Sequence, residues 1–230
     1  MLYDIVKPIL DKLDPSTAHR LMMRNIEWFT TFGCHEKVCA LPDENPVYVM
    51  GLRFPNAVGL AAGLDRNGEE VSSFGALGFG FVEAGSITPS AYEASPSAVC
   101  KRDLKNSSIL HSMNLGSIGG EAALLRLKSA DAFYLRGGIT GISIAPDPQS
   151  SQQSALHDLK GLLRMLHIRA DYFALNLFCP ASSDPLVWFK NPAALKELLE
   201  ALSTEQKRLA EDSGRPQRPI ALKISADLSR

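Results

Sequence analysis

An asparagine and, shortly after it, a cysteine stand at the end of an apolar run that is typical of a buried strand. The run is Tyr172–Leu177; Asn176 lies near its end, and Cys179 follows just beyond it. An amide can hold a polar ligand, and a thiol becomes a base when a neighbour lowers or exploits its pKa of about 8.5. A free cysteine is also commonly a small buried hydrophobic residue. Both interpretations are open for Cys179, and the core residue is favoured when the position is taken alone.

A lysine lies inside another apolar run. Lys223 stands in the segment Ala221–Ser225, which reads ALKIS. A cation in an apolar strand is costly unless it meets an anionic partner. We therefore expect either an electron-rich ligand beside Lys223 or a lysine at the strand end whose amine reaches solvent.

Small residues surround the end of a third apolar run. The segment Ala61–Glu69 reads AAGLDRNGE, and small residues allow a flat ligand to approach the backbone closely. The alternative is a tight turn in which Asp65 or Asn67 caps the next helix, and the local sequence favours this turn. The chain contains neither GxGxxG nor GxxxxGKT, so it has no nucleotide-binding glycine motif of those kinds.

Two hydroxyl groups follow a fourth apolar run. The segment Gly78–Pro89, GFGFVEAGSITP, reads as a buried strand that ends at Gly85 and continues into Ser86 and Thr88. Hydroxyl groups at this position can bind a cofactor ring or satisfy the backbone of the loop.

Five apolar runs predict strands that are covered on both faces, as in a parallel sheet. They are Ala57–Ala62, Phe79–Ala84, Ile139–Ile144, Tyr172–Leu177 and Ile220–Ser225. Helical patterns lie between these runs, at Gly68–Leu77, Glu121–Lys128, Ser154–Leu166 and Pro192–Ala210. This alternation predicts right-handed βαβ units and an α/β fold, and it leaves a doubly wound sheet and a (β/α) barrel both open.

Further elements are predicted around this alternation. A small hairpin is expected over Val47–Phe54, and loops are expected at Ser86–Ser108, Ala145–Gln153 and Cys179–Trp188. Each loop follows a predicted strand, at the end where α/β folds place their chemistry.

Two amphipathic helices are predicted within residues 1–30. Leu2, Ile9 and Leu13 share the apolar face of the first helix, and the segment Asp14–Ser16 then interrupts the pattern with a proline. Such helices pack onto the following domain, or they form a cap for a membrane surface or an apolar ligand.

Composition limits the classes of function. The chain has 230 residues, with 24 Lys and Arg against 25 Asp and Glu, and its hydrophobic fraction is 45%. This balance gives no reason to expect a nucleic-acid partner, and no apolar run reaches the length of about 18 residues that a membrane span needs. The four cysteines form no CxxC pair, which predicts a reducing, cytosolic compartment. We assign no metal site.

The order of these motifs resembles that of the dihydroorotate dehydrogenase family over essentially the whole chain. AAGLD at 61–65 and GFGFVEAGSITP at 78–89 carry most of the resemblance, followed by Asn176, Cys179–Pro180 and Leu222–Ile224. The resemblance implies an FMN-containing (β/α)₈ barrel of the TIM type. It also implies oxidation of dihydroorotate to orotate in pyrimidine biosynthesis.

The two N-terminal helices and His19 make the chain similar to the membrane-associated, quinone-using class of this family. The resemblance implies that His19 and Arg102 lie at the mouth of a quinone site. It further implies a cytoplasmic protein that is peripheral on the inner membrane, where a quinone reoxidises the flavin.

The resemblance also implies cofactor-binding residues. Ala62 and Gly63 would lie against the flavin, and Ser86 would supply a hydroxyl where the family usually has threonine. Lys223 would lie near the pyrimidine edge of the flavin, where a positive charge stabilises the reduced anionic ring. Cys179 falls where this class uses serine as the base and where the soluble class uses cysteine.

Substrate-binding positions depart from the family pattern. Asn176 matches a substrate-binding asparagine, but Arg66 stands where lysine is expected and His111 stands where a substrate amide is expected. Ser143 and Ala181 replace two further asparagines. Each lost hydrogen bond costs about 1 kcal/mol or more, which predicts weaker orotate binding. The alternative function is a non-catalytic relative that acts as an interaction or membrane-surface protein.

Length predicts an incomplete barrel. Eight (β/α) units typically take about 250 residues, and the sequence shows about five of these eight strands. We expect a helical cap over 1–45 and a partial barrel over 46–230, without the late Gly-rich loops that bind the FMN phosphate. The first and fifth strands would then be open edges that favour self-association.

Overall fold

The computed structural model shows an α/β fold built around one parallel sheet. The part of the chain that the structure describes is residues 7–8, 10–37, 41–43, 45–93, 99–103, 105–112, 116–178 and 186–225. The predicted positions Cys179 and Ala181 lie outside these residues, as does most of the first predicted N-terminal helix.

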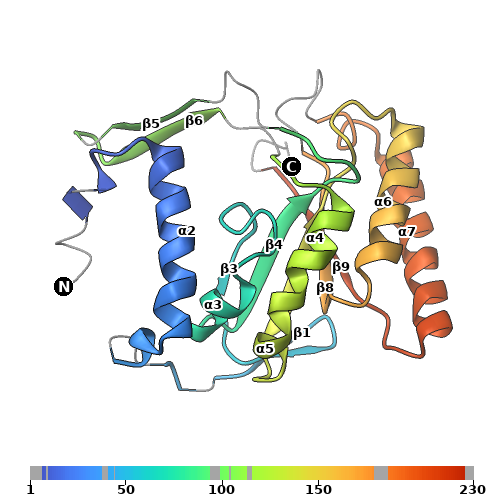
Figure 1. The fold of residues 1–230 in the computed structure, drawn as a ribbon. Helices are drawn as coiled ribbons and strands as arrows, with labels where there is room; N and C mark the ends of the chain where they lie inside the picture. Colours follow the sequence, from blue (N-terminus) through green and yellow to red (C-terminus); the bar gives the residue numbers. More distant parts are fainter. Residues whose placement is uncertain are drawn as a thin grey trace.

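Five parallel strands form the central sheet (Figure 1). In spatial order they are β3 (Gly59–Leu60), β4 (Phe81–Ile87), β7 (Ile139–Ile144), β8 (Tyr172–Asn176) and β9 (Ile220–Lys223). This order follows the chain, as in a (β/α) barrel, whereas a doubly wound sheet reverses its order part-way. All five predicted strands are therefore confirmed. In the described residues β3 and β9 do not pair with each other, so the sheet is open, as expected for a partial barrel.

A helix lies between each pair of successive strands, as the sequence predicted. These helices are α3 (Val71–Ala76), α4 (Gly120–Arg126), α6 (Gln152–Leu166) and α7 (Pro192–Ser213). The short helices η2 (Leu127–Ala130) and α5 (Asp131–Tyr134) follow α4 before β7 begins. The main core lies between the helices and the sheet, where Leu166, Phe173 and Leu202 are fully buried.

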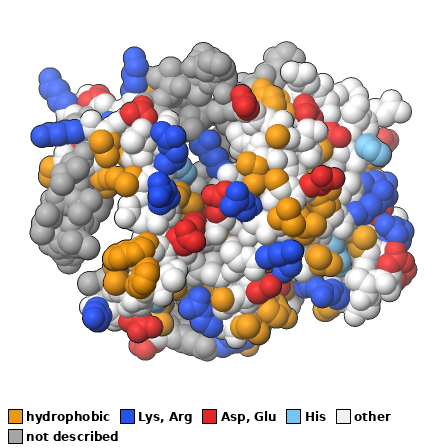
Figure 2. Space-filling view, in the orientation of Figure 1, with side chains coloured by type: hydrophobic (Ala, Val, Ile, Leu, Met, Phe, Trp, Pro, Cys, Tyr) orange, Lys and Arg blue, Asp and Glu red, His pale blue; other side chains and the backbone are white. Residues whose placement is uncertain are grey.

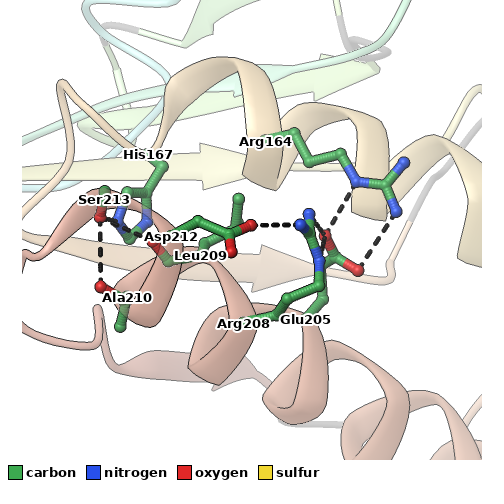
Figure 3. A network of polar contacts seen from close by, with 8 residues as sticks. All are labelled: Arg164, His167, Glu205, Arg208, Leu209, Ala210, Asp212 and Ser213. Atoms are coloured by element: carbon green, nitrogen blue, oxygen red, sulfur yellow. Dashed lines mark hydrogen bonds and ion pairs between the residues drawn. The ribbon is translucent and has the colours of Figure 1, made fainter.

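Charged side chains join α6 to α7, which lie side by side (Figures 1 and 3). Glu205 of α7 is buried and accepts hydrogen bonds from Arg164 Nε at 2.8 Å and from Arg208 Nη2 at 2.6 Å. These two guanidinium groups, Arg164 first, lower the pKa of Glu205 to about 2. Arg208 also pairs with Asp212 one turn further along α7. The network keeps a buried carboxylate ionised between the two helices.

One N-terminal helix, α2 (Pro15–Thr31), packs against α3. It begins after Asp14, whose Oδ1 accepts the backbone N–H groups of Ser16 and Thr17, and Pro15 occupies its first turn. Ile26 on its inner face packs against the main core. The second predicted N-terminal helix is therefore confirmed. No helix among the described residues combines the length and apolar character that a membrane span requires.

Two antiparallel hairpins lie outside the central sheet. β1 (Val47–Val49) and β2 (Leu52–Phe54) form the hairpin that the sequence predicted. A second hairpin is formed by β5 (Val99–Asp103) and β6 (Ser108–Ser112). The prediction of a loop throughout Ser86–Ser108 is therefore wrong. Lys101, Asp103 and most of β6 are exposed, so no buried apolar run marks these strands in the sequence.

Candidate functional site

The carboxyl ends of the strands bring several predicted residues to one edge of the sheet. Ser86 lies at the end of β4, Asn176 at the end of β8 and Lys223 at the end of β9. Asn176 and Lys223 are register partners in neighbouring parallel strands. The backbone of Ala62, just after β3, lies at the same edge because its N–H donates to Glu83 of β4 at 3.3 Å.

A buried carboxylate holds Lys223 at this edge. Glu83 Oε1 accepts a hydrogen bond from Lys223 Nζ at 2.5 Å, and Oε2 accepts one from the Tyr172 hydroxyl at 3.2 Å. Lys223 keeps about a third of its side chain exposed (35%), whereas Glu83 is buried. The anionic partner that Lys223 requires is thus supplied within the chain, and a ligand would meet the exposed part of a fixed cation.

The phenol of Tyr172 is a further hydrogen-bond donor to Glu83. Burial raises the pKa of Tyr172, and the negative charge and hydrogen bond of Glu83 raise it further. The hydroxyl therefore stays protonated at neutral pH and remains a donor. Glu83 consequently ties β4 to β8, to β9 and to the turn after β3 by charge and hydrogen bonds.

A short chain of hydrogen bonds joins three strand ends. Ser86 Oγ lies 2.8 Å from Ser143 Oγ of β7, and Asn176 Nδ2 donates to Ser86 Oγ at 2.9 Å. Asn176 Oδ1 in turn accepts the backbone N–H of Phe178 at 3.2 Å. Ser143, which stands where the family pattern has asparagine, is fully buried. A polar ligand at this edge would extend or replace these bonds, because the hydroxyl of Ser86 already takes part in two.

The turn after β3 is tight and open on one side. Gly63 has φ +116°, its N–H donates to Gly85 O at 2.9 Å, and a Cβ at Gly63 would meet no atom within 4 Å. Asp65 accepts the N–H groups of Glu69 and Glu70, each at 2.9 Å, so the predicted turn is confirmed. The predicted helix cap is wrong, because the N-cap residue of α3 is Glu70 and no side chain caps that helix. The same turn leaves space beside Gly63 for a flat group, so the two interpretations from sequence are compatible.

Arg66 binds this turn and acts electrostatically on His19 of helix α2. Its Nε donates to Gly63 O at 3.2 Å. Burial lowers the pKa of His19 on α2, and the positive charge of Arg66 lowers it further. His19 is therefore neutral at pH 7 and lies within electrostatic reach of Arg66.

Arg102 joins the β5–β6 hairpin to the N-terminal segment. Its Nη1 donates to Leu10 O at 3.1 Å and to Leu13 O at 2.8 Å. Carbonyl groups at the end of a helical segment commonly accept hydrogen bonds from a cationic side chain in this way. The structure therefore gives Arg102 a positioning contact. His111 lies on β6 opposite Cys100 in register, and only its backbone is described.

Sequence reasoning missed Glu83 and Tyr172. The signal was present, because Glu83 is a carboxylate in the middle of an apolar strand and Lys223 is a cation in another. Two opposite charges in buried strands of one parallel sheet predict an ion pair.

Comparison with known sequences identifies the family. The family model described as dihydroorotate dehydrogenase matches residues 46–230. The chain belongs to this family. Proteins named "Dihydroorotate dehydrogenase (quinone)" are 32% identical in Polynucleobacter asymbioticus and 36% identical in Nitrosomonas eutropha, and each alignment covers 99% of this chain. The chain spans 65% and 64% of the length of these two relatives, which is less than two thirds.

Solved structures support the same fold. The crystal structure of DHODH from Eimeria tenella in complex with ferulenol matches with a TM-score of 0.80 at 27% identity. The match covers 98% of this chain and 63% of that chain. The ligand-free structure from the same organism gives a TM-score of 0.77. The five-stranded sheet is therefore part of a TIM-type barrel architecture.

Proposed function

We propose that this chain binds FMN at the carboxyl edge of its sheet and oxidises dihydroorotate to orotate in pyrimidine biosynthesis, with a quinone as the final electron acceptor. The observation that carries the proposal is the Lys223 amine, held by Glu83 beside the open turn at Gly63. The family membership and the names of the relatives support it.

The residues at this edge fit the flavin. Lys223 supplies a fixed positive charge for an electron-rich ring, Ser86 supplies a hydroxyl, and the backbone at Ala62 and Gly63 leaves room for a flat group. FMN, when bound, would accept a hydride from dihydroorotate and pass electrons to the quinone. Glu83 keeps the Lys223 amine in place, so little reorganisation is needed when the ring gains negative charge.

Cys179 is proposed as the base that removes the substrate proton, and Asn176 as a hydrogen-bonding residue for the substrate. Cys179 follows β8 closely in the chain. Replacing Cys179 with alanine should abolish reduction of the flavin by dihydroorotate while FMN stays bound. Cys34→Ala is the matched control, because Cys34 is a free cysteine after α2. Full activity of Cys179→Ala would exclude Cys179 from proton transfer.

Arg66 and His111 are proposed to contact the substrate. Arg66 donates to the carbonyl of Gly63, and this contact supports the proposal because we assign the space beside Gly63 to the flavin. Arg66→Ala should raise the KM for dihydroorotate about tenfold, as loss of a hydrogen bond to a charged ligand does. Unchanged flavin and substrate affinity in Arg66→Ala would show that Arg66 is a surface residue that contacts neither flavin nor substrate.

We propose that α2 contacts a membrane surface on the cytoplasmic side of the inner membrane, where quinone would reach His19 and Arg102. Figure 2 shows hydrophobic side chains gathered at the lower end of α2, and Trp28 and Phe32 are 58% and 67% exposed. Exposed aromatic side chains of this kind favour an interfacial location. Liposome co-sedimentation should weaken in the Trp28→Ala, Phe32→Ala double variant, whereas unchanged binding would contradict this location.

Self-association through sheet edges is also proposed. β3 and β9 each pair with one strand only among the described residues, and open edges favour pairing with a second copy. Light scattering after gel filtration should give a mass above that of one chain, and a monomer at all concentrations would contradict it.

One observation favours the alternative, a non-catalytic relative. Ser86, Ser143 and Asn176 already form hydrogen bonds with one another, so fewer donors and acceptors are left for a substrate. Two further asparagines of the family pattern are replaced. The two functions are separated by mixing the FMN-loaded chain with dihydroorotate without oxygen. Loss of flavin absorbance supports the enzyme, whereas bound flavin that stays oxidised supports the non-catalytic relative.

A further inference from the structure

A pocket lies at the amino-terminal end of the sheet, opposite the edge that carries the candidate site. It has a volume of about 390 Å³. Its walls come from α5, from the start of β7 and from the segments just before β8 and β9. Three arginines line it, namely Arg169, Arg215 and Arg218. The pocket takes no part in the function proposed above.

Positive charge exceeds negative charge in this pocket. Two carboxylates, Asp131 and Asp171, face the three guanidinium groups. Asp171 is largely engaged by the chain, because its Oδ2 accepts the backbone N–H of Thr140 at 2.8 Å. Burial raises the pKa of Asp171, while the hydrogen bond from Thr140 and the charge of Arg218 oppose the rise.

The arginines also act on a neighbouring histidine. Burial lowers the pKa of His167, and the positive charges of Arg218 and Arg215 lower it further. A positive potential therefore extends through the wall of the pocket.

The guanidinium groups retain unused donors. Arg169 donates through Nη1 to Asp131 Oδ1 at 2.6 Å, and Arg218 Nη1 lies 3.9 Å from Asp171 Oδ1. The Nε atoms of both arginines are buried and have no hydrogen-bond partner in the described part of the chain. A buried N–H without an acceptor destabilises the free pocket, so an acceptor that reached it would be favoured.

We propose that this pocket binds a phosphate group, either as inorganic phosphate or as part of a small phosphomonoester. Arginine presents a planar pair of donors that matches two phosphate oxygens. Arg169 and Arg218 must turn their Nε edges toward the ligand, and both side chains are partly exposed (20% and 14%). Tyr134 and Ile168, which are exposed at the pocket, would contact the organic part of an ester.

The test is a titration of the full chain with inorganic phosphate, followed by NMR of the arginine Nε–Hε groups. Signals of Arg169 and Arg218 should shift and reach saturation. Arg215→Gln should weaken phosphate binding about tenfold, as loss of a hydrogen bond between charged groups does. Arg24→Gln removes one exposed positive charge from α2 and should leave the affinity unchanged. Sodium chloride at the same ionic strength controls for screening.

Phenyl phosphate distinguishes the two sources of the phosphate group. Tighter binding than inorganic phosphate assigns the pocket to a phosphomonoester, and equal binding assigns it to free phosphate. Arginine signals that do not move with either probe would overturn the proposal. Equal weakening by Arg215→Gln and Arg24→Gln would also overturn it, because the effect would then come from the net charge of the chain. Circular dichroism of each variant checks that the fold is kept.

Discussion

Lys223 Nζ of β9 lies 2.5 Å from Glu83 Oε1 of β4, although the strands β7 and β8 lie between β4 and β9 in the order of the sheet. The Tyr172 hydroxyl also donates a hydrogen bond to Glu83. This one buried carboxylate therefore binds side chains from β8 and β9 and holds the Lys223 amine at the edge of the sheet. This arrangement makes the cation part of the scaffold before any ligand arrives.

Removing the charge of Glu83 should release Lys223. We expect Glu83→Gln to lower the free energy of unfolding by about 2 kcal/mol, because Lys223 would lose its partner in a partly buried site. Urea unfolding measures this change, with Glu197→Gln on the exposed face of α7 as the control. In the Glu83→Gln, Lys223→Met double variant the loss should be smaller than the sum of the single losses. Additive losses would show that the two side chains act independently.

Glu70 should make stability depend on pH. Burial raises its pKa to about 7, helped by the charges of Glu27, Asp65 and Glu69, while a hydrogen bond from Ser73 opposes the rise. The ordinary value is 4.5, so the stabilising contribution of the neutral form is complete below pH 4.5 and is lost as the pH rises through about 7.

Glu70→Gln should remove this dependence. The free energy of unfolding of the variant should exceed that of the parent chain by about 1 kcal/mol at about pH 8 and by little at about pH 4. Urea unfolding measures this difference. Glu197→Gln should show the same pH profile as the parent chain. If the stability of Glu70→Gln depended on pH as that of the parent chain does, another group would be responsible for the pH dependence.

The contribution of Glu205 to stability should depend on pH in the opposite direction. Arg164 and Arg208 lower its pKa to about 2, so its contribution is present above pH 4.5 and is lost as the pH falls toward 2. Glu205→Gln should lower the free energy of unfolding by about 1–2 kcal/mol at neutral pH, since the charge-assisted hydrogen bonds from Arg164 and Arg208 weaken. The difference should vanish in acid. A constant difference across the acid range would contradict the ion-pair explanation.

Alanine substitutions at two glycines can distinguish the effect of backbone strain from the effect of filling the space for a ligand. Gly63 and Gly51 both have positive φ, and a Cβ at either one would meet no atom within 4 Å. Alanine at each position should cost about 1 kcal/mol of stability from strain alone. FMN affinity should fall only in Gly63→Ala, because Gly51 lies in the β1–β2 turn. Equal FMN affinity in both variants would show that the flavin does not approach Gly63.

The parallel sheet could be predicted from sequence because its strands read as apolar runs, and the three central strands, β4, β7 and β8, are mostly buried on both faces. Val82 and Ile142, for example, are fully buried. The β5–β6 hairpin could not be predicted in this way. Its strands pair through the backbone and are held by Arg102, a contact with Leu10 and Leu13 from distant sequence.

The strand ends and the turn of the candidate site were predictable from sequence, and its central ion pair was indicated by the sequence but not predicted. Sequence reasoning placed Ser86 and Asn176 at strand ends, which the structure bears out, and left open whether Lys223 lies at the end of its strand, as it does. It did not pair Lys223 with Glu83, although two opposite charges in apolar strands indicate an ion pair; the distance between the two side chains depends on how the sheet folds.

The most direct measurement is the visible absorption spectrum of the purified chain with FMN, recorded before and after dihydroorotate is added without oxygen. The account predicts a bound flavin whose absorbance falls on addition of dihydroorotate, and a clear loss of FMN affinity in Lys223→Ala. A chain that takes up no FMN, or that binds it equally well after Lys223→Ala, would contradict the account.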